Sequence, residues 1–417
     1  MFELSISGAV IKMSNSGSVE NIDYKVFTVC NLAYLPKALV LAESLLAFNH
    51  TKLKIFIFDK KVEGDLPHDL ADFEWVEDLG LENFSQYAFK YDITEFSTSL
   101  KPWLTLRLLE SVEKVVFLDP DTCLFNSLDP LLNLLDEKEV VLTPHYVTPH
   151  PEGDVGMMRF GSFNMGFFAV NSSSESIRFL KWWNERCLDL CYFETQFGLS
   201  TDQKWVSIAP CFFPNLHISF DLGYNVAFWN AHERVVSRNP QGGYLINNQY
   251  PLIFFHFSSF DEKNPDLLSK RAFADRESGR TDYSELAHGY NTSLQRLKIP
   301  ISKTKYGFDF MSNGDYISPT LRRAYASVLD DLPSGHDPFD SNGPVAEFAK
   351  KNYLVSDKLG YQPSGFGDIA SNKGKFVLVN KLMKMALYAL GPNRFMNFSR
   401  LLVYLSSFRL NRDMWKL

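Results

Sequence analysis

The stretch Val115-Val116-Phe117-Leu118-Asp119-Pro120-Asp121-Thr122 decides the fold of this chain. Its four leading apolar residues predict a strand that is buried on both faces. Pro120 ends that strand because proline cannot donate to a sheet ladder. Asp119 and Asp121 therefore lie at the carboxyl end of a buried strand, where open α/β sheets bind ligands. Two hard oxygen ligands favour a divalent cation bound to phosphates. A turn whose carboxylates only cap the next helix is the alternative.

Strands and helices alternate around this stretch. Residues 25–30 and 53–59 are predicted strands, and residues 35–48 between them have the apolar spacing of a helix. Such a β-α-β unit implies a parallel strand pair with a right-handed crossover. Helices are also predicted at residues 102–111 and 127–135. The pattern predicts an α/β fold with a mostly parallel central sheet flanked by helices.

Length and composition predict more than one structural unit. A chain of 417 residues that is 45% hydrophobic can bury a large core. The turn-rich stretch 332–344 marks a boundary. We expect a catalytic domain over residues 1–260, a mostly helical extension and linker over 261–345, and a basic helical tail over 346–417.

Charge is distributed unevenly along the chain. The net charge of −7 argues against nucleic acid as a partner. Residues 370–417, however, hold nine basic residues and one acid, a charge of +8, which leaves −15 for the rest. The composition of this tail predicts a pair of basic amphipathic helices with a break at Gly391-Pro392. We expect this pair to bind an anionic membrane surface. Docking of the tail on the protein's own acidic body is the alternative.

Sequence features also predict the compartment. The first eight residues carry an acid, Glu3, and too short an apolar run for a signal peptide. The five cysteines form an odd set without paired spacing, which favours buried thiols in a reducing environment. The expected location is the cytoplasm, peripherally on the inner face of the cell membrane.

Three later segments carry polar groups of interest. Residues 160–171 form an aromatic strand interrupted by small residues, and a glycine inside a strand often marks a close backbone approach. Asp202 and Gln203 open a predicted helix. The last buried strand, over residues 252–259, carries His256.

Taken together, these motifs resemble a known family. Leu118-Asp119-Pro120-Asp121 is an Asp-x-Asp motif, and it is followed in order by Phe163–Asn171, Asp202-Gln203 and His256-Phe257-Ser258-Ser259. This order is similar to that of GT-A glycosyltransferases, most closely family 8, the galactosyltransferase and glycogenin relatives, over roughly residues 25–263. The resemblance implies the Rossmann-like GT-A fold with a helical C-terminal extension.

The resemblance also implies an activity. Family members move a sugar from a nucleotide-diphosphate sugar, here expected to be UDP-linked, and retain the anomeric configuration. The expected acceptor is a glycan or a lipid-linked molecule in surface polysaccharide synthesis. A divalent metal stabilises the departing diphosphate. Two carboxylates and an imidazole suit Mn²⁺, with Mg²⁺ as the alternative, so Asp119, Asp121 and His256 are the expected metal ligands.

By resemblance, the sugar side of the site consists of Asn164, Asp202 and Gln203. Asn164 would line the donor sugar, whereas the acid and the amide would lie by the sugar hydroxyls and the anomeric carbon. Such groups can hydrogen-bond adjacent hydroxyls and fix the orientation of the sugar. For Asp202 the alternative is simple helix capping. Of the tryptophans, Trp229 is the one we expect to contact a sugar.

The expected nucleotide side is less well defined. Lys101 and Lys263 could neutralise the diphosphate or could be ordinary surface lysines. Thr28, Cys30, Asn31 and Tyr34 follow or end the first strand and are the candidates for binding the base. Cys30 occupies the position at which family members carry an acid, which leaves the base specificity open.

Three other functions fit parts of the pattern. An aspartate-based phosphatase carries its Asp-x-Asp motif near the start of the chain with Gly-Thr after it, whereas Thr122 and Cys123 follow here. A sugar nucleotidylyltransferase would need a glycine-rich loop after the first strand. A catalytically silent sugar-binding or scaffold protein with the same fold is the strongest alternative.

Overall fold

The computed structural model describes residues 23–267, 269–270, 280–355, 373–407 and 414–415. These residues form two compact units. The first lies within Met1–Glu82 and Ile93–Gly307, and the second within Asn83–Asp92 and Phe308–Leu417. This division differs from the boundaries at residues 260 and 345 that the sequence predicted, since residues 83–92 join the second unit. Every predicted site residue lies in the first unit.

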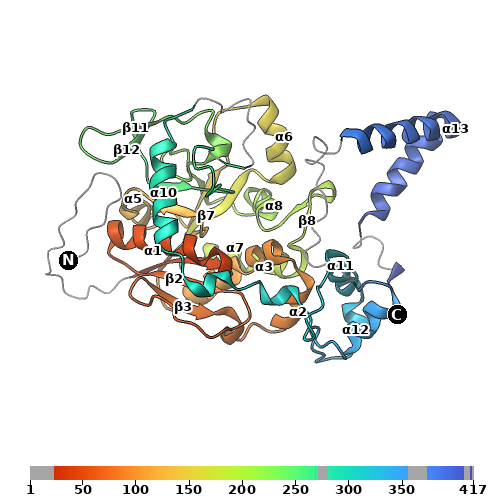
Figure 1. Ribbon diagram of the computed structural model, residues 1–417. Helices are drawn as coiled ribbons and strands as arrows, with labels where there is room; N and C mark the ends of the chain where they lie inside the picture. The colour runs from red at the N-terminus through yellow and green to blue at the C-terminus, as the bar shows by residue number, and fades with distance from the viewer. Residues whose placement is uncertain (1–22, 268, 271–279, 356–372, 408–413, 416–417) are drawn as a thin grey trace. The chain divides into compact units, whose positions relative to one another are not determined.

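The first unit is built on a mostly parallel sheet (Figure 1). Its seven strands, in spatial order, are β10 (Leu216–Ile218), β6 (Val140–Pro144), β7 (Phe163–Asn171), β4 (Lys114–Leu118), β1 (Tyr24–Cys30), β2 (Leu53–Ile57) and β3 (Ala71–Trp75). Only β7 runs antiparallel to its neighbours β4 and β6. The mostly parallel sheet was predicted, whereas the reversal of β7 was not. Because of this reversal, the amino end of β7 lies beside the carboxyl end of β4.

Helices cover both faces of this sheet. On one face, Phe27, Phe117 and Phe168 form a row of rings that ends on Trp183 of α7 (Ser174–Leu190). On the other face, β-strand residues such as Val116 pack with the buried side of α1 (Leu35–Asn49). Residues of one strand alternate between these two cores because side chains of a strand point alternately to opposite faces.

Further helices and short strands complete this unit. They are α3 (Ile93–Ser99), α4 (Lys101–Leu108), α5 (Asp129–Leu134), α6 (Pro151–Phe160), α8 (Gln203–Val206), α10 (Ser284–Arg296), β8 (Phe193–Glu194), β9 (Leu199–Ser200), β11 (Val236–Arg238), β12 (Tyr244–Ile246) and β13 (Tyr250–Pro251). Of the described helices, only Leu32–Asn49, essentially α1, is long and apolar enough to span a membrane. It is largely buried in the core described above.

A separate pair of short strands brings distant residues to the end of β4. β5 (Thr122–Leu124) follows the Asp-Pro-Asp turn and pairs antiparallel with β14 (Phe254–His256). In this register His256 lies opposite Thr122. The histidine therefore arrives next to Asp121 even though the two are far apart in the sequence.

The second unit is held together around Arg322. Its helices include α2 (Phe84–Lys90), α11 (Pro319–Val328) and α12 (Pro344–Lys351). The buried Arg322 guanidinium on α11 donates to the carbonyl oxygens at the end of α2, which are those of Ala88, Phe89 and Tyr91. It also forms an ion pair with Asp309 at 2.9 Å. One side chain thus ties the segment 83–92 to residues more than 200 positions later.

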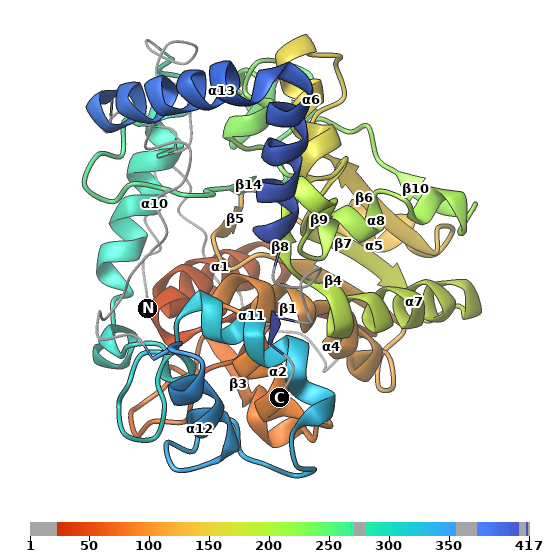
Figure 2. The same ribbon diagram turned by 90° about the vertical axis from the view of Figure 1, so that its right-hand side faces the viewer.

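The tail forms the predicted pair of helices. α13 (Lys373–Leu405) consists of two helical arms that meet at Gly391, whose φ of 74° and ψ of 164° are not helical (Figures 1 and 2). Pro392 follows directly, so the break occurs where the sequence predicted it. Large apolar side chains on both arms are exposed, namely Val377, Leu378, Val379, Leu382, Met385, Leu387, Tyr388, Leu390, Met396, Phe398, Leu401, Leu402, Val403, Tyr404 and Leu405.

Candidate metal and sugar site

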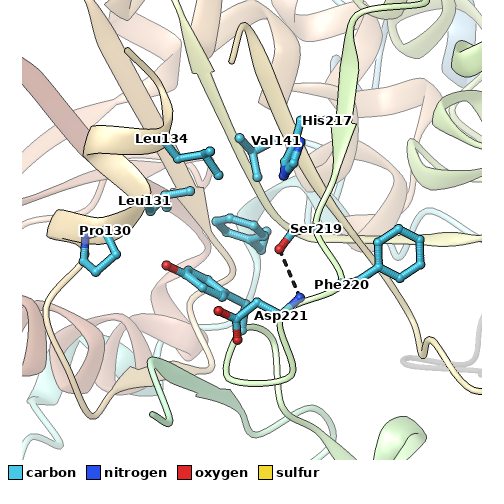
Figure 3. Close-up of a pocket in the computed structure, with 10 residues that line it drawn as sticks. Pro130, Leu131, Leu134, Val141, His217, Ser219, Phe220 and Asp221 are labelled. Carbon is cyan, nitrogen blue, oxygen red and sulfur yellow. Dashed lines mark hydrogen bonds between the residues drawn. The ribbon is translucent and has the colours of Figure 1, made fainter. Parts of the chain in front are cut away.

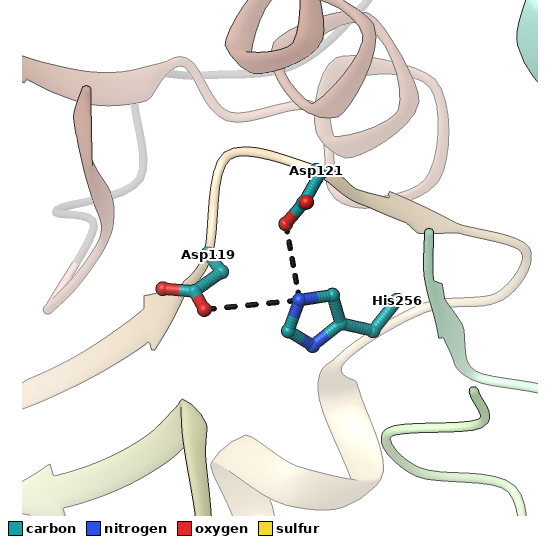
Figure 4. A group of neighbouring side chains, drawn as sticks. All are labelled: Asp119, Asp121 and His256. Atoms are coloured by element: carbon teal, nitrogen blue, oxygen red, sulfur yellow. Dashed lines mark ion pairs between the residues drawn. The ribbon is translucent and has the colours of Figure 1, made fainter. Parts of the chain in front are cut away.

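Asp119, Asp121 and His256 meet at the carboxyl end of β4 (Figure 4). The Nε2 atom of His256 lies 3.0 Å from an Asp121 oxygen and 3.7 Å from an Asp119 oxygen. His256 is almost fully buried, whereas Asp119 is about one quarter exposed (26%). The structure therefore brings the three expected metal ligands together, with one side open to an incoming group.

Gly166 of β7 makes room for this cluster. A Cβ atom at this position would lie 2.4 Å from Cε1 of His256 and 2.7 Å from Oδ2 of Asp119. The Gly166 carbonyl also accepts the Asp119 backbone amide at 2.8 Å, which fixes the end of β4. The close backbone approach that the sequence predicted for a glycine in this strand is confirmed.

The charges at the site favour an ionised Asp121. Burial alone would raise the pKa of its carboxyl, but the neighbouring His256 and Lys37 lower the pKa below its ordinary value. The Lys37 ammonium, in the first turn of α1, lies 3.8 Å from Asp121 and 4.1 Å from the centre of the Tyr34 ring. Sequence reasoning missed Lys37. Its position after the first strand was a signal, but its approach to Asp121 depends on the tertiary fold.

These residues fit a divalent metal ion. Two carboxylates and one imidazole supply the mixed oxygen and nitrogen donors that Mn²⁺ accepts. Their donor atoms all lie within 4.8 Å of one another, so a single ion could reach all three. The absence of a side chain at residue 166 keeps the space between them open.

Lys101 connects this cluster to Asp202. Its Nζ atom lies 3.3 Å from Asp119 and 3.1 Å from Asp202, and it donates to the Met165 carbonyl at 2.9 Å. Burial opposes its charge, but the two carboxylates dominate and raise the pKa of Lys101. Burial also raises the pKa of Asp202, although Lys101 counteracts this effect. Lys101 is therefore not a surface lysine.

The three predicted sugar-side residues, Asp202, Gln203 and Asn164, differ in the contacts that their side chains make. Asp202 stands at the position before α8 but makes no side-chain capping bond, so helix capping does not explain it. Gln203 is half-buried, and its amide donates to the Phe160 carbonyl at 2.9 Å. The Asn164 oxygen accepts from the Gly166 amide and from the Asn225 side chain, both at 3.1 Å.

The predicted base-binding residues differ in accessibility. Thr28 and Cys30 are buried in β1, and burial raises the pKa of the Cys30 thiol. Asn31 accepts the Tyr34 amide at 3.2 Å and so caps a short 3₁₀ turn. Tyr34 is 43% exposed and is the one member of this set with a large accessible surface. Lys263 is exposed.

Aromatic rings form one wall of the cluster. The Trp229 ring packs edge-on against His256 with ring centroids 5.1 Å apart, and the centroids of Trp229 and His145 are 5.7 Å apart. Trp229 therefore lies at the site, where its predicted contact with a sugar can be tested. The buried position of His145 lowers its pKa to about 4, so its ring is neutral near pH 7.

A pocket of about 350 Å³ lies on the same sheet but outside the cluster (Figure 3). Its floor is apolar, and His217, Ser219 and Asp221 stand at one side. None of the predicted site residues lines it. We assign it no role in the reaction.

Comparison with known families supports the resemblance. Residues 25–177, about a third of the chain, match the model of glycosyl transferase family 8. This region includes Asp119, Asp121 and Asn164, whereas Asp202, Gln203 and His256 lie beyond it. The similarity to family 8 glycosyltransferases thus covers the part of the chain that forms all strands of the seven-stranded sheet except β10.

Two proteins of Bacillus subtilis (strain 168) are similar in sequence, and both are described as uncharacterized. YfnF is 27% identical over 176 residues, which cover 40% of this chain and 58% of YfnF. YfnD is 27% identical over 199 residues, which cover 46% of this chain and 60% of YfnD. The matched region therefore spans about three fifths of each relative.

Solved glycosyltransferase structures are also similar, at low identity. The galactosyltransferase LgtC in complex with donor and acceptor sugar analogs is 15% identical, with 66% of this chain and 97% of LgtC covered and a TM-score of 0.39. GlyE of Streptococcus pneumoniae TIGR4 is 18% identical, with 68% of this chain and 66% of GlyE covered and a TM-score of 0.38.

Proposed function

We propose that this protein is a metal-dependent glycosyltransferase. The proposal is supported by the match to the family 8 model and by the position of His256 next to Asp119 and Asp121 of the Asp-x-Asp motif. Its donor is a nucleotide-diphosphate sugar, most simply a UDP-sugar, and its acceptor is a glycan or a lipid-linked molecule of a surface polysaccharide. The sugar is transferred with retention at the anomeric carbon. The observation that carries this proposal is the cluster of Asp119, Asp121 and His256 around the space left by Gly166.

Each side of the site has a defined task in this proposal. Asp119, Asp121 and His256 hold Mn²⁺ or Mg²⁺, which supplies positive charge to the departing diphosphate. Lys37, beside Asp121, adds a second positive charge at that end, and Tyr34 offers its exposed ring to the base. Lys263 remains a candidate for a further contact to the diphosphate, whereas the Lys101 ammonium already contacts Asp119, Asp202 and the Met165 carbonyl.

The sugar is oriented at the other end of the cluster. The ion pair with Lys101 holds the carboxylate of Asp202 at a fixed place, from which it can accept hydrogen bonds from sugar hydroxyls. Asn164 and Gln203 offer amide groups on the same side. Such positioning lowers the barrier to transfer because the reacting atoms are already aligned.

The test is a thermal-shift screen of UDP-, GDP-, ADP- and CMP-sugars, each with and without Mn²⁺. We expect one nucleotide sugar to raise the melting temperature only with Mn²⁺, and Asp121→Ala to abolish the shift. Release of the nucleotide from that sugar should need Mn²⁺ as well. Binding without any nucleotide release, with every acceptor class tried, would favour the silent sugar-binding protein; no binding in either condition would refute the proposal.

We further propose that α13 holds the enzyme peripherally on the cytoplasmic face of a membrane. Residues 373–405 contain six Lys or Arg residues and no acid, and the exposed apolar side chains of both arms would insert between lipids. An anionic surface complements this charge. A lipid-linked acceptor would then be presented to the enzyme at the same surface.

A further inference from the structure

Asn225 lies between the metal side and the sugar side of the site. Its side chain is buried, and its backbone adopts a left-handed conformation with φ of 52°. The amide nitrogen lies 3.1 Å from Oγ1 of Thr143 and 3.1 Å from Oδ1 of Asn164. The amide oxygen lies 3.3 Å from Nδ1 of His256. One side chain therefore contacts both an expected metal ligand and an expected sugar-binding residue.

The hydrogen bonds at this position fix which atom is the donor in each pair. The Gly166 amide can only donate, so the Asn164 atom that faces it must be the oxygen. The Asn225 atom that faces this same oxygen must then be the NH₂ group. The remaining Asn225 atom is its oxygen, which can only accept, so Nδ1 of His256 must carry a proton.

This assignment determines the state of His256 toward a metal. In a neutral imidazole with a proton on Nδ1, Nε2 carries the lone pair. Nε2 is the atom that faces Asp121 at 3.0 Å and Asp119 at 3.7 Å. The lone pair and the two carboxylates thus point toward one shared position. Partners that fix the tautomer of a ligating histidine typically change metal affinity by 10- to 100-fold when removed.

The backbone explains how Asn225 reaches this place. The His256 amide donates to the Val226 carbonyl at 2.8 Å, so the segment around Val226 runs beside β14. The Asn230 side chain donates to the Asn225 carbonyl at 3.0 Å, which holds the left-handed turn from the other side. Asparagine and aspartate tolerate this conformation better than other residues with a side chain, and glycine adopts it freely.

We propose that Asn225 is a positioning residue that sets the tautomer of His256 and the orientation of the Asn164 amide. The proposal deepens the metal-dependent transfer described above and rests on it. Through one chain of hydrogen bonds from Gly166 to His256, Asn225 couples the geometry of the metal ligand to that of the sugar contact.

Three variants test this role. Asn225→Gly keeps the backbone and removes both contacts. Asn225→Asp keeps an oxygen for Nδ1 of His256 but loses the donor to Asn164. Asn247→Gly is the matched control, because Asn247 has a similar φ of 53° and also forms side-chain hydrogen bonds, at an exposed position outside the site.

The first measurement is Mn²⁺ affinity, from the electron paramagnetic resonance signal of free Mn²⁺, with the full-length protein alone and with UDP. We expect Asn225→Gly to weaken Mn²⁺ binding at least tenfold, and Asn225→Asp and Asn247→Gly to stay within threefold of the wild type. With the best nucleotide sugar of the screen, Asn225→Asp should raise KM for that donor. Wild-type Mn²⁺ affinity in Asn225→Gly, or an equal loss in Asn225→Asp, would overturn the proposal.

The second measurement needs no metal. In protein labelled with ¹⁵N-histidine, the Nδ1 atom of wild-type His256 should carry a proton, and Asn225→Gly should lose or weaken this Nδ1–H signal. A wild-type ring without a proton on Nδ1 would contradict the proposal. If the Nδ1 form is found but the wild type binds no Mn²⁺, the metal-dependent function fails while the orienting role of Asn225 stands.

Discussion

At the residue scale, the site depends on side chains whose roles come from their neighbours. Asp119, Asp121 and His256 could be predicted as a group because their order along the chain resembles a family motif. Lys37 and Asn225 could not, because Lys37 reaches Asp121 only through the packing of α1, and Asn225 reaches His256 only through a left-handed turn beside β14. No periodicity or motif in the sequence indicates either contact.

Gly166→Ala should weaken metal binding without unfolding the protein. The added methyl group would lie 2.4 Å from His256 and 2.7 Å from Asp119, so both ligands must move. We expect Mn²⁺ affinity to fall at least tenfold in a titration of free Mn²⁺. Gly156→Ala in α6 is the control, because a Cβ there meets no atom within 4 Å. Normal Mn²⁺ binding by Gly166→Ala would show that the ion does not occupy this space.

Lys101→Met should destabilise the fold, and more so at high pH. It leaves the buried carboxylate of Asp202 without its cation, and loss of one partner of a buried pair costs roughly 3–5 kcal/mol. Burial already raises the pKa of Asp202, and the variant raises it further. The folded protein then binds a proton that the unfolded chain has released, so the unfolding free energy falls as pH rises above the pKa of the unfolded chain.

Urea unfolding of Lys101→Met at pH 5 and pH 8 measures this effect, with the larger deficit relative to the wild type expected at pH 8. Lys263→Met serves as the control, since Lys263 is exposed and its loss should leave stability unchanged. A deficit that is equal at both pH values would mean that Asp202 is not the group that responds.

At the element scale, the sequence predicted long elements well and short or reversed ones poorly. The helix predicted at residues 35–48 lies within one residue of α1, because its apolar spacing extends over several turns. The three-residue strands β5 and β10 have no such repeat, whereas β14 falls within the buried strand predicted at residues 252–259. The antiparallel direction of β7 follows from its pairing with β4, which a hydrophobic pattern does not encode.

Arg322→Met should loosen the connection between α2 and α11. It removes the donor to the carbonyls of Ala88, Phe89 and Tyr91 and the partner of Asp309, and each buried acceptor left unpaired costs about 1–3 kcal/mol. Hydrogen exchange should show faster exchange in peptides that cover residues 83–92. Unchanged exchange there would mean that aromatic contacts alone hold the segment.

Charge reversal on α13 should release the protein from anionic vesicles. Lys381, Lys384, Arg394 and Arg400 changed together to glutamate would lose about 1 kcal/mol of attraction each, so we expect at least a hundredfold weaker binding in co-sedimentation with phosphatidylglycerol vesicles. A variant that exchanges Lys for Arg at these positions should bind normally. Equal sedimentation of both variants would favour docking of the tail on the protein itself.

At the scale of the whole molecule, the chain contains two compact units, and only the first carries the site. The length and composition of the chain suggested more than one unit, but they did not indicate where the boundaries between the units lie. The turn-rich stretch 332–344 lies inside the second unit, and residues 83–92 belong to that unit although they follow the third strand of the first. Such a division depends on long-range contacts and not on local sequence.

We expect the two units to respond separately to heat. In differential scanning calorimetry, Mn²⁺ with UDP should raise the temperature of one transition only, since ligands stabilise the unit that binds them. Arg322→Met should lower the other transition. A single transition that both changes shift together would show that the units unfold as one.

The place of residues 83–92 in the second unit also has a consequence for synthesis. This segment leaves the ribosome roughly 200 residues before the part of the chain from residue 308 onward with which it packs. Translation adds about 5–20 residues per second, so about 10–40 seconds pass between the synthesis of Phe84 and Phe89 and that of Phe308 and Tyr325. These are the rings that they contact in the folded protein. During that interval two aromatic side chains are available to a chaperone. The second unit can be completed only after the whole of the first has been translated, because the first ends at Gly307 and the second resumes at Phe308.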